Sequence, residues 1–147
     1  MKPHTLSIYY RQGVLYIQPS LPSRRGIIPL ESVIVAEGGW SGLRAALMEG
    51  ERIALLEAQK QPGKRHYADD STLARAAGCR NFREFIPGTV QCTFNRVPDY
   101  VLVVRSLPNL ELGAMVGTPR QDELPPDSTL DRLALVARDV IEGKNGW

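Results

Sequence analysis

The chain has 147 residues, a net charge of +2, and apolar and charged shares of 43% and 23%. These values are typical of one ordinary globular domain, so we expect residues 1–147 to fold as a single domain without a disulfide or a metal. No apolar run reaches the about 20 residues that cross a bilayer, and the N-terminus lacks the apolar core of a signal peptide. We therefore expect a cytoplasmic protein without membrane contact.

Two apolar segments near the N-terminus are separated by Gln12-Gly13, a pair that suits a tight turn. Residues 6–10 alternate between apolar and polar side chains, and residues 14–17 form a second apolar run. The pattern predicts a β-hairpin. A Pro-rich loop carrying Arg24-Arg25 and a short extended segment at residues 33–35 are predicted to follow it.

The middle of the chain predicts helices. Apolar residues recur at helical spacing from Ser41, a suitable N-cap, to about residue 58, and Gln61-Pro62-Gly63 ends the pattern. The stretch at residues 71–88 predicts two short helical turns. Their expected caps are Ser71 and Asn81, and Gly78 is expected to end the first turn in a left-handed conformation.

A second hairpin is predicted after these turns. Residues 90–95 alternate cleanly, and a turn around Pro98 leads into residues 100–104, which are apolar on both faces and should lie inside a sheet. Residues 107–127 are rich in Pro and Gly, so we expect an irregular stretch around one short strand at residues 113–117.

The last predicted helix begins in a capping box at Ser128 and ends at Gly143. The resulting order of elements is two strands, helices, two strands and a final helix. This order predicts an α+β fold in which an antiparallel sheet, built from two hairpins, is packed by about three helices.

No set of residues is typical of an active site or a metal centre. Cys79 and Cys92 lack metal-ligand spacing, and Cys92 falls on the apolar face of its strand, which favours a packing role. A remote enzyme alternative would use His66 with Asp69 and Asp70 as an acid–base cluster, but we interpret them as a solvated loop. We therefore predict no enzyme, no catalytic residue, no cofactor and no metal.

Charge is distributed unevenly along the chain. Residues 1–30 hold four basic residues and no acid, whereas residues 109–131 hold five acids against Arg120 alone. Such an asymmetry can steer a charged partner to one end of a molecule. Gly38-Gly39-Trp40-Ser41-Gly42 precedes a helix and has backbone N–H groups that suit an anion, but it lacks the lysine of a phosphate loop, so we interpret it as a flexible approach to the helix.

The segment at residues 77–85 has the packing motif Ala-Gly-x-x-x-Phe-x-x-Phe, placed between a first helix and two strands. With this motif, residues 41–142 resemble the immunity proteins of bacterial contact-dependent growth inhibition systems. The resemblance implies a non-enzymatic toxin inhibitor that acts by protein–protein interaction. It binds the C-terminal domain of a cognate toxin, often a nuclease, and covers the active site in a toxin–immunity complex.

Our candidates for the toxin-binding surface are four acids and an outward-facing leucine: Glu111, Asp122, Glu123, Asp127 and Leu135. Nuclease inhibitors of this kind are often acidic, whereas this chain is slightly basic. Either the acidic region at residues 109–131 alone faces the toxin, or the toxin is not a basic nuclease. The alternative function is a nucleic-acid-binding or regulatory module that uses the basic N-terminal hairpin. We do not expect nucleic acid because the chain lacks a strong positive excess, and the oligomeric state stays open.

Overall fold

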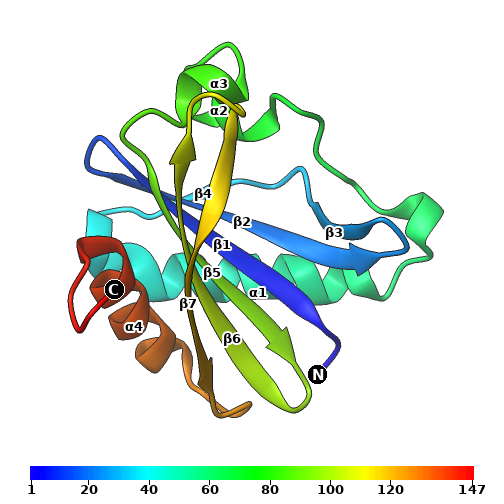
Figure 1. The fold of residues 1–147 in the computed structure, drawn as a ribbon. Coiled ribbons are helices and arrows are strands. Elements are labelled where there is room, and N and C mark those ends of the chain that lie inside the picture. Colours follow the sequence, from blue (N-terminus) through cyan, green and yellow to red (C-terminus); the bar gives the residue numbers. More distant parts are fainter.

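A computed structural model describes all of residues 1–147 and shows an α+β fold (Figure 1). Its antiparallel sheet has the strand order β3-β2-β1-β5-β6-β7, and β4 pairs separately with β2. The predicted fold class is confirmed, although the sheet has more strands than two hairpins supply. In chain order the elements are β1 (His4–Arg11), β2 (Val14–Ser23), β3 (Gly26–Pro29), β4 (Ile34–Val35), the 3-10 helix η1 (Gly39–Gly42), α1 (Leu43–Ala58), the 3-10 helix η2 (Pro62–Lys64), α2 (Thr72–Ala76), α3 (Phe82–Phe85), β5 (Val90–Val97), β6 (Tyr100–Asn109), β7 (Ala114–Leu124) and α4 (Leu130–Glu142).

The first strand lies in the middle of the sheet. β1 and β2 form the predicted hairpin, in which Gln12 and Gly13 both have positive φ, at 50° and 80°. Two positive φ values match the twist of the flanking strands and explain the glycine. On its other side β1 pairs with β5, where Ile8 lies opposite Cys92.

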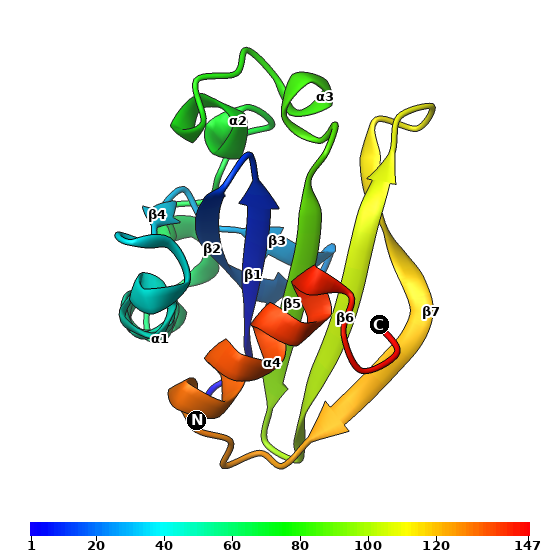
Figure 2. The ribbon, with the colours of Figure 1, turned by 90° about the vertical axis from the view of Figure 1, so that its left-hand side faces the viewer.

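One face of the sheet is apolar, and α1 and α4 cover it (Figure 2). We call it the helix-covered face. Its core includes Leu6, Ile17 and Phe94 from the strands and Leu47 and Leu133 from the helices, each at most 1% exposed. Complete burial of such a side chain contributes about 1.5–3 kcal/mol. The predicted helical stripes therefore hold the fold together here.

The opposite face of the sheet, the polar face, carries hydrogen-bonding side chains along its central strands. These side chains are at most 9% exposed: Thr5, Ser7, Gln18, Ser20 and Gln91. The short helices α2 and α3 cover one end of this face, where Phe85 packs edge-on against Tyr9 and Tyr16 with ring centroids 5.8 and 5.7 Å away. The two faces therefore bury chemically different side chains.

The strand predicted at residues 113–117 is present as the start of β7, but the prediction that the rest of residues 107–127 is irregular was wrong. β6 extends to Asn109 and pairs with β7, an edge strand of 11 residues. A shift of register between Val104 and Ser106 bulges this pair, and Pro119 lies on the opposite strand at the bulge. Proline is tolerated at a sheet edge because no outer neighbour needs its missing N–H. The part of this edge strand that contains the proline was therefore mistaken for a loop.

Several helix ends agree with prediction, and two do not. Gly78 has φ +75° and follows α2 as expected, and Gly143 caps α4 with φ +71°. Ser41 does not cap α1, because η1 comes first and Gly42 occupies the N-cap position. α4 starts one residue later than predicted, since the cap is Thr129, whose hydroxyl accepts a hydrogen bond from the Arg132 N–H. None of the helices combines the length and the apolar character that crossing a membrane requires.

Candidate functional site

A groove of about 530 Å³ lies on the polar face, beside α2 and α3. Tyr9 and Gln18 line it from the sheet, Ile28 and Pro29 line it from β3, and Gly113 lines it from the β6–β7 turn. The remaining lining residues come from the loop before α2 and from the two short helices: Ala68, Asp69, Asp70, Leu73 and Phe82. The groove therefore joins segments that are far apart in the sequence, and its volume suits a peptide segment or a small molecule.

Hydrogen bonds hold the sheet residues of this groove in place. The Gln91 side-chain amide donates to the Tyr9 hydroxyl at 3.2 Å, and the Gln18 amide donates to the Leu30 carbonyl at 3.0 Å. Burial raises the pKa of Tyr9 to about 12. The phenol is therefore neutral near pH 7, and this part of the groove offers fixed, uncharged hydrogen-bonding groups.

The β6–β7 turn next to the groove exposes four large aliphatic side chains. We call residues 107–116 the hairpin tip. Leu107, Leu110, Leu112 and Val116 are 36%, 59%, 66% and 44% exposed, and Leu107 lies directly opposite Val116 in the strand pair. Aliphatic residues gathered in this way on a surface indicate an interaction site, whereas single ones do not.

The hairpin tip is anchored to α3. The Arg83 guanidinium donates to the Leu110 carbonyl at 3.3 Å and lies against Gly113. A Cβ at Gly113 would be only 2.6 Å from the Arg83 Cζ, and the φ of this glycine is +68°, so position 113 requires glycine. The sequence analysis missed the tip because it took this stretch for a loop. The signal available was the spacing of the leucines in a region otherwise rich in Pro and Gly.

The predicted acids do not form one patch. Glu111 is at the hairpin tip, whereas Asp122 and Glu123 are near the far end of β7 and Asp127 follows it. The strand between them is on the order of 30 Å long. In the β6–β7 register, Asp122 lies opposite Val103, whose side chain is on the helix-covered face. Glu123 lies opposite Leu102 and therefore faces the polar side. The acidic residues that are close together in the sequence therefore do not form a single acidic surface.

One of these acids is engaged within the protein. Asp122 accepts two hydrogen bonds from the Arg120 guanidinium, at 3.0 and 2.8 Å, and this pairing lowers the pKa of the carboxyl group. The same guanidinium lies 4.0 Å above the Trp147 ring. Glu111, Glu123 and Asp127 are exposed and make no salt bridge. They remain free to meet a partner.

Leu135 is 68% exposed on α4, as its place on the helical wheel predicts. It faces away from the buried side of the helix, where Leu133, Ala137 and Val140 pack onto the core. Its place on α4 separates it from the hairpin tip, which lies at the same end of the molecule as α2 and α3 (Figures 1 and 2). It is a single exposed leucine on a helix surface.

The structure does not assemble the acid–base cluster considered for His66. The His66 ring bonds to Glu57 at 3.1 Å, and the His66 N–H donates to the same carboxylate. Asp69 instead accepts hydrogen bonds at the start of α2, including one from Arg75 that lowers its pKa. Bonds from Lys60 and His66 outweigh desolvation and lower the pKa of Glu57 to about 2. These residues fix the loop after α1.

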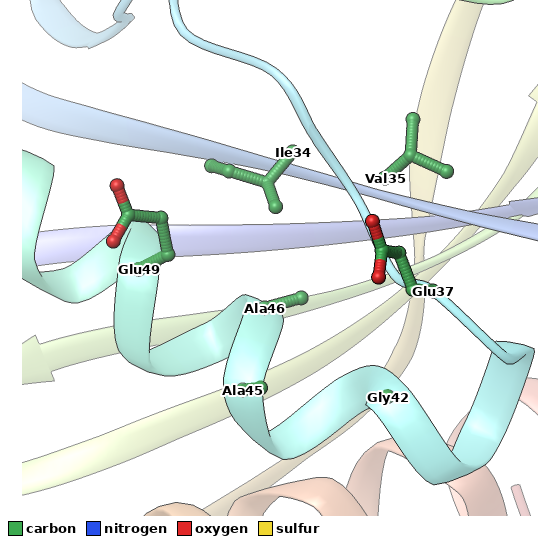
Figure 3. A pocket seen from close by; sticks show the side chains of 7 residues that line it. All are labelled: Ile34, Val35, Glu37, Gly42, Ala45, Ala46 and Glu49. Atoms are coloured by element: carbon green, nitrogen blue, oxygen red, sulfur yellow. The ribbon is translucent and has the colours of Figure 1, made fainter.

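The glycine-rich segment at residues 38–42 lies beside a different cavity, shown in Figure 3. This cavity of about 370 Å³ lies between β4 and α1, with Ile34 and Ala46 among its apolar lining. Glu37 and Glu49 contribute carboxylates to the same lining (Figure 3). Two carboxylates disfavour an anion, so the anion-binding interpretation of this segment gains no support.

A buried ionic network that the sequence analysis missed ties the first strand to the rest of the fold. Glu51 of α1 accepts hydrogen bonds from His4 at 2.8 Å and from Arg96 at 2.6 Å. Arg96 also donates to the Ser128 carbonyl, just before α4. His4 and Arg96 are 2% and 6% exposed. Because they lie inside the protein, these groups serve structure and not surface recognition.

Cysteine chemistry offers no alternative site. Cys79 and Cys92 are both free and buried, and burial raises the pKa of the Cys92 thiol. Cys92 packs beside Phe94 in the core of the helix-covered face, as predicted. No group of three or more His, Cys, Asp or Glu side chains comes together in the structure.

Comparison with known proteins adds no relative. No protein-family model matches the chain, and no curated protein matches it. Interpretation of the groove and the hairpin tip therefore depends on their own geometry and on the sequence motif described above.

Proposed function

We propose that this protein is a non-enzymatic immunity protein that binds the C-terminal domain of a cognate contact-dependent growth inhibition toxin and covers its active site. The sequence motif that suggests this family builds the α2–α3 unit, where Phe82 lines the groove and Phe85 is fully buried. The motif also contains Arg83, which anchors the hairpin tip. The residues behind the resemblance therefore support a turn that exposes four aliphatic side chains.

The hairpin tip is the observation that carries the proposal. Its four aliphatic side chains are accessible, and the Arg83 hydrogen bond and the β6–β7 pairing hold them in position before a partner arrives. A preorganised apolar surface loses less conformational entropy on binding than a flexible loop. Large apolar side chains surrounded by polar groups are typical of the centre of a protein–protein interface.

The proposal requires that a toxin domain is encoded next to this chain, and the test is co-expression with that domain. We expect the toxin domain alone to arrest growth of a bacterial host, and co-expression of this protein to restore growth. The two proteins should also co-purify as a stable complex. Growth arrest that persists with the folded protein present, together with no complex, would contradict the proposal.

A pair of variants tests whether the hairpin tip makes the contact. Leu110→Asp/Leu112→Asp places charges on the most exposed part of the tip, and we expect it to abolish growth rescue while the protein stays folded. Leu135→Asp places a charge on an equally exposed leucine of α4 and serves as the control. Loss of rescue by Leu135→Asp alone would move the interface to α4.

A further inference from the structure

A second depression adjoins the groove at the β3 edge of the sheet. It has a volume of about 590 Å³, and Ile28 lines both depressions. The β2–β3 turn contributes Arg24 and Arg25 to its walls, and the segment after α1 contributes Arg65 and Tyr67. We call this depression the basic pocket.

The cations of the basic pocket lack counter-ions. Arg24 and Arg25 are exposed and make no salt bridge, Lys64 beside Arg65 makes none either, and no acidic residue lines the pocket. Uncompensated charges of one sign repel one another and add nothing to folding. Elsewhere seven arginines pair with carboxylates: Arg44, Arg52, Arg75, Arg80, Arg96, Arg120 and Arg138. The concentration of unpaired cations therefore indicates a binding role.

Arg65 gives the pocket one fixed charge. Its guanidinium donates to the Glu57 carbonyl at 3.2 Å, to the Ala58 carbonyl at 3.4 Å and to the Tyr67 hydroxyl at 3.2 Å. These carbonyls belong to the last turn of α1, where a cation is favoured by the helix dipole. Three of five N–H donors are used in this way, so the remaining two can meet an anion.

We infer that the basic pocket binds an acidic segment of the partner protein. Carboxylates of that segment pair with Arg24 and Arg25, whose planar forks match a carboxylate. An aliphatic side chain of the same segment packs on Pro22 and Pro62, which also line the pocket. The inference rests on the proposed function only in taking the partner to be the toxin domain.

The pocket fits an acidic protein segment better than a nucleic acid. A nucleic-acid groove tracks several phosphates and presents aromatic rings on which bases stack. Here the cations surround one local depression, and its aromatic ring, Tyr67, packs against the Leu21 and Leu30 core and accepts a hydrogen bond from Arg65. The net charge of the chain is only +2.

The first test needs no toxin. A labelled short polyglutamate peptide is titrated against the protein at low salt, beside an oligothymidylate of equal charge. We expect the peptide to bind wild type more tightly than the oligothymidylate does. We expect Arg24→Gln/Arg25→Gln to weaken peptide binding about tenfold, the loss expected when strong charge-assisted hydrogen bonds are removed.

The matched control removes two exposed arginines elsewhere. Arg44→Gln/Arg132→Gln changes the net charge equally, on α1 and α4, and should leave peptide binding within about twofold. Equal weakening by both double variants would reduce the effect to net charge and overturn the inference. Tighter binding of the oligothymidylate, with the same dependence on Arg24 and Arg25, would overturn it in favour of nucleic acid. Absence of peptide binding to wild type would also overturn it.

The second test uses the toxin domain and separates the inference from the proposed function. We expect Arg24→Gln/Arg25→Gln to bind the toxin domain about tenfold more weakly than wild type, with a smaller dependence on salt. Arg24→Lys/Arg25→Lys should recover part of the lost affinity because lysine keeps the positive charge but lacks the planar guanidinium that binds a carboxylate with two hydrogen bonds. Equal affinity of wild type and the Gln variant would overturn the inference and leave the immunity function standing. Failure of wild type to bind the toxin domain would overturn the proposed function, and the peptide titration would still decide the chemistry of the pocket.

Discussion

The two faces of the sheet bury similar fractions of their side chains by different means. On the helix-covered face, Phe94 and Ile8 are fully buried because α1 and α4 pack on them. On the polar face, Thr5 and Gln91 are nearly as inaccessible, and they bond to neighbours on the same face: Thr5 donates to Asn95 at 2.7 Å and Gln91 donates to Tyr9 and Thr93. The buried fraction of a side chain alone therefore does not distinguish the apolar core of the helix-covered face from the hydrogen-bonded polar face.

Because of this difference, we expect the two faces to have different roles, one in stability and the other in binding. Apolar burial supplies most of the free energy of folding, so substitutions on the helix-covered face should change stability. Hydrogen bonds between side chains contribute only about 0.5–1.5 kcal/mol each, so substitutions on the polar face should change stability little. The groove is on the polar face, and the hairpin tip and the basic pocket each share a lining residue with it, so changes at these three places should act on binding.

The largest expected effect is on the helix-covered face. Phe94→Ala removes a fully buried ring from the core and should lower the free energy of unfolding by about 3–5 kcal/mol in urea denaturation. Thr93→Ala, the next residue, faces the other way and should cost less than about 1 kcal/mol. Similar losses for the two variants would show that the polar face is as important for stability as the core.

The next effect concerns acid, and it acts on the loop after α1, which Glu57 binds through His66. Glu57 has a folded pKa of about 2 against an ordinary value of 4.5, so the unfolded state binds more protons between these values. Its stabilisation is complete above about pH 4.5 and is lost as pH falls toward 2. We expect a loss on the order of 1 kcal/mol, allowing for solvent around its exposed partners.

Glu57→Gln provides the control for this acid effect. The variant should be less stable than wild type at pH 6, and the difference should shrink as pH falls toward 2 because protonated Glu57, like glutamine, has no charge. Thermal unfolding at a series of pH values measures this. A pH-independent difference between the two proteins would mean that the loop after α1 does not depend on the charge of Glu57.

An effect of similar size is expected where the short helices cover the polar face. Gly78 has φ +75° and open space around the position of a Cβ, so the cost of a side chain comes from the backbone alone. Gly78→Val should destabilise the protein by about 1 kcal/mol or more. Gly63 also has open space but no positive φ, so Gly63→Ala should be nearly neutral in the same denaturation experiment.

The smallest effect compares adjacent acids of β7 on opposite faces. Glu123 is unpaired on the polar face, so Glu123→Gln should slow association with the toxin domain about twofold at low salt and leave stability unchanged. Asp122 is bound to Arg120 on the helix-covered face, so Asp122→Asn should act on stability instead. Stopped-flow association across a salt series, with a melting curve for each variant, separates these outcomes. A slower on-rate for Asp122→Asn alone would reverse the assignment.

Local patterns were sufficient to predict most of the fold. The β1–β2 hairpin follows from alternation on both sides of Gln12-Gly13, and α4 follows from its apolar stripe and Gly143. The N-cap of α4 was displaced by one residue because Ser128 and Thr129 both carry a hydroxyl that can cap. Only the geometry shows that Ser128 donates to the Pro125 carbonyl instead.

Long-range features were not predictable in the same way. The sequence predicts β7 only as a short strand at residues 113–117 because Pro119 breaks the strand pattern, and whether a sheet edge tolerates proline depends on which strands are neighbours. Because β7 is one continuous edge strand, Glu111 and Asp127 lie near its opposite ends, and the sequence alone does not show this separation. The network of Glu51 with His4 and Arg96 joins residues whose proximity depends on the finished sheet.

The central place of β1 has a consequence for how the protein is made. β1 is synthesised first, yet one of its edges pairs with β5, so that Ile8 reaches Cys92 only after most of the chain has left the ribosome. Until then that edge has unpaired backbone groups that can join another nascent chain. Pairings between residues so distant in sequence also slow folding. Rapid overproduction should therefore favour aggregates of partly made chains, and slower translation at low temperature should increase the yield of native protein.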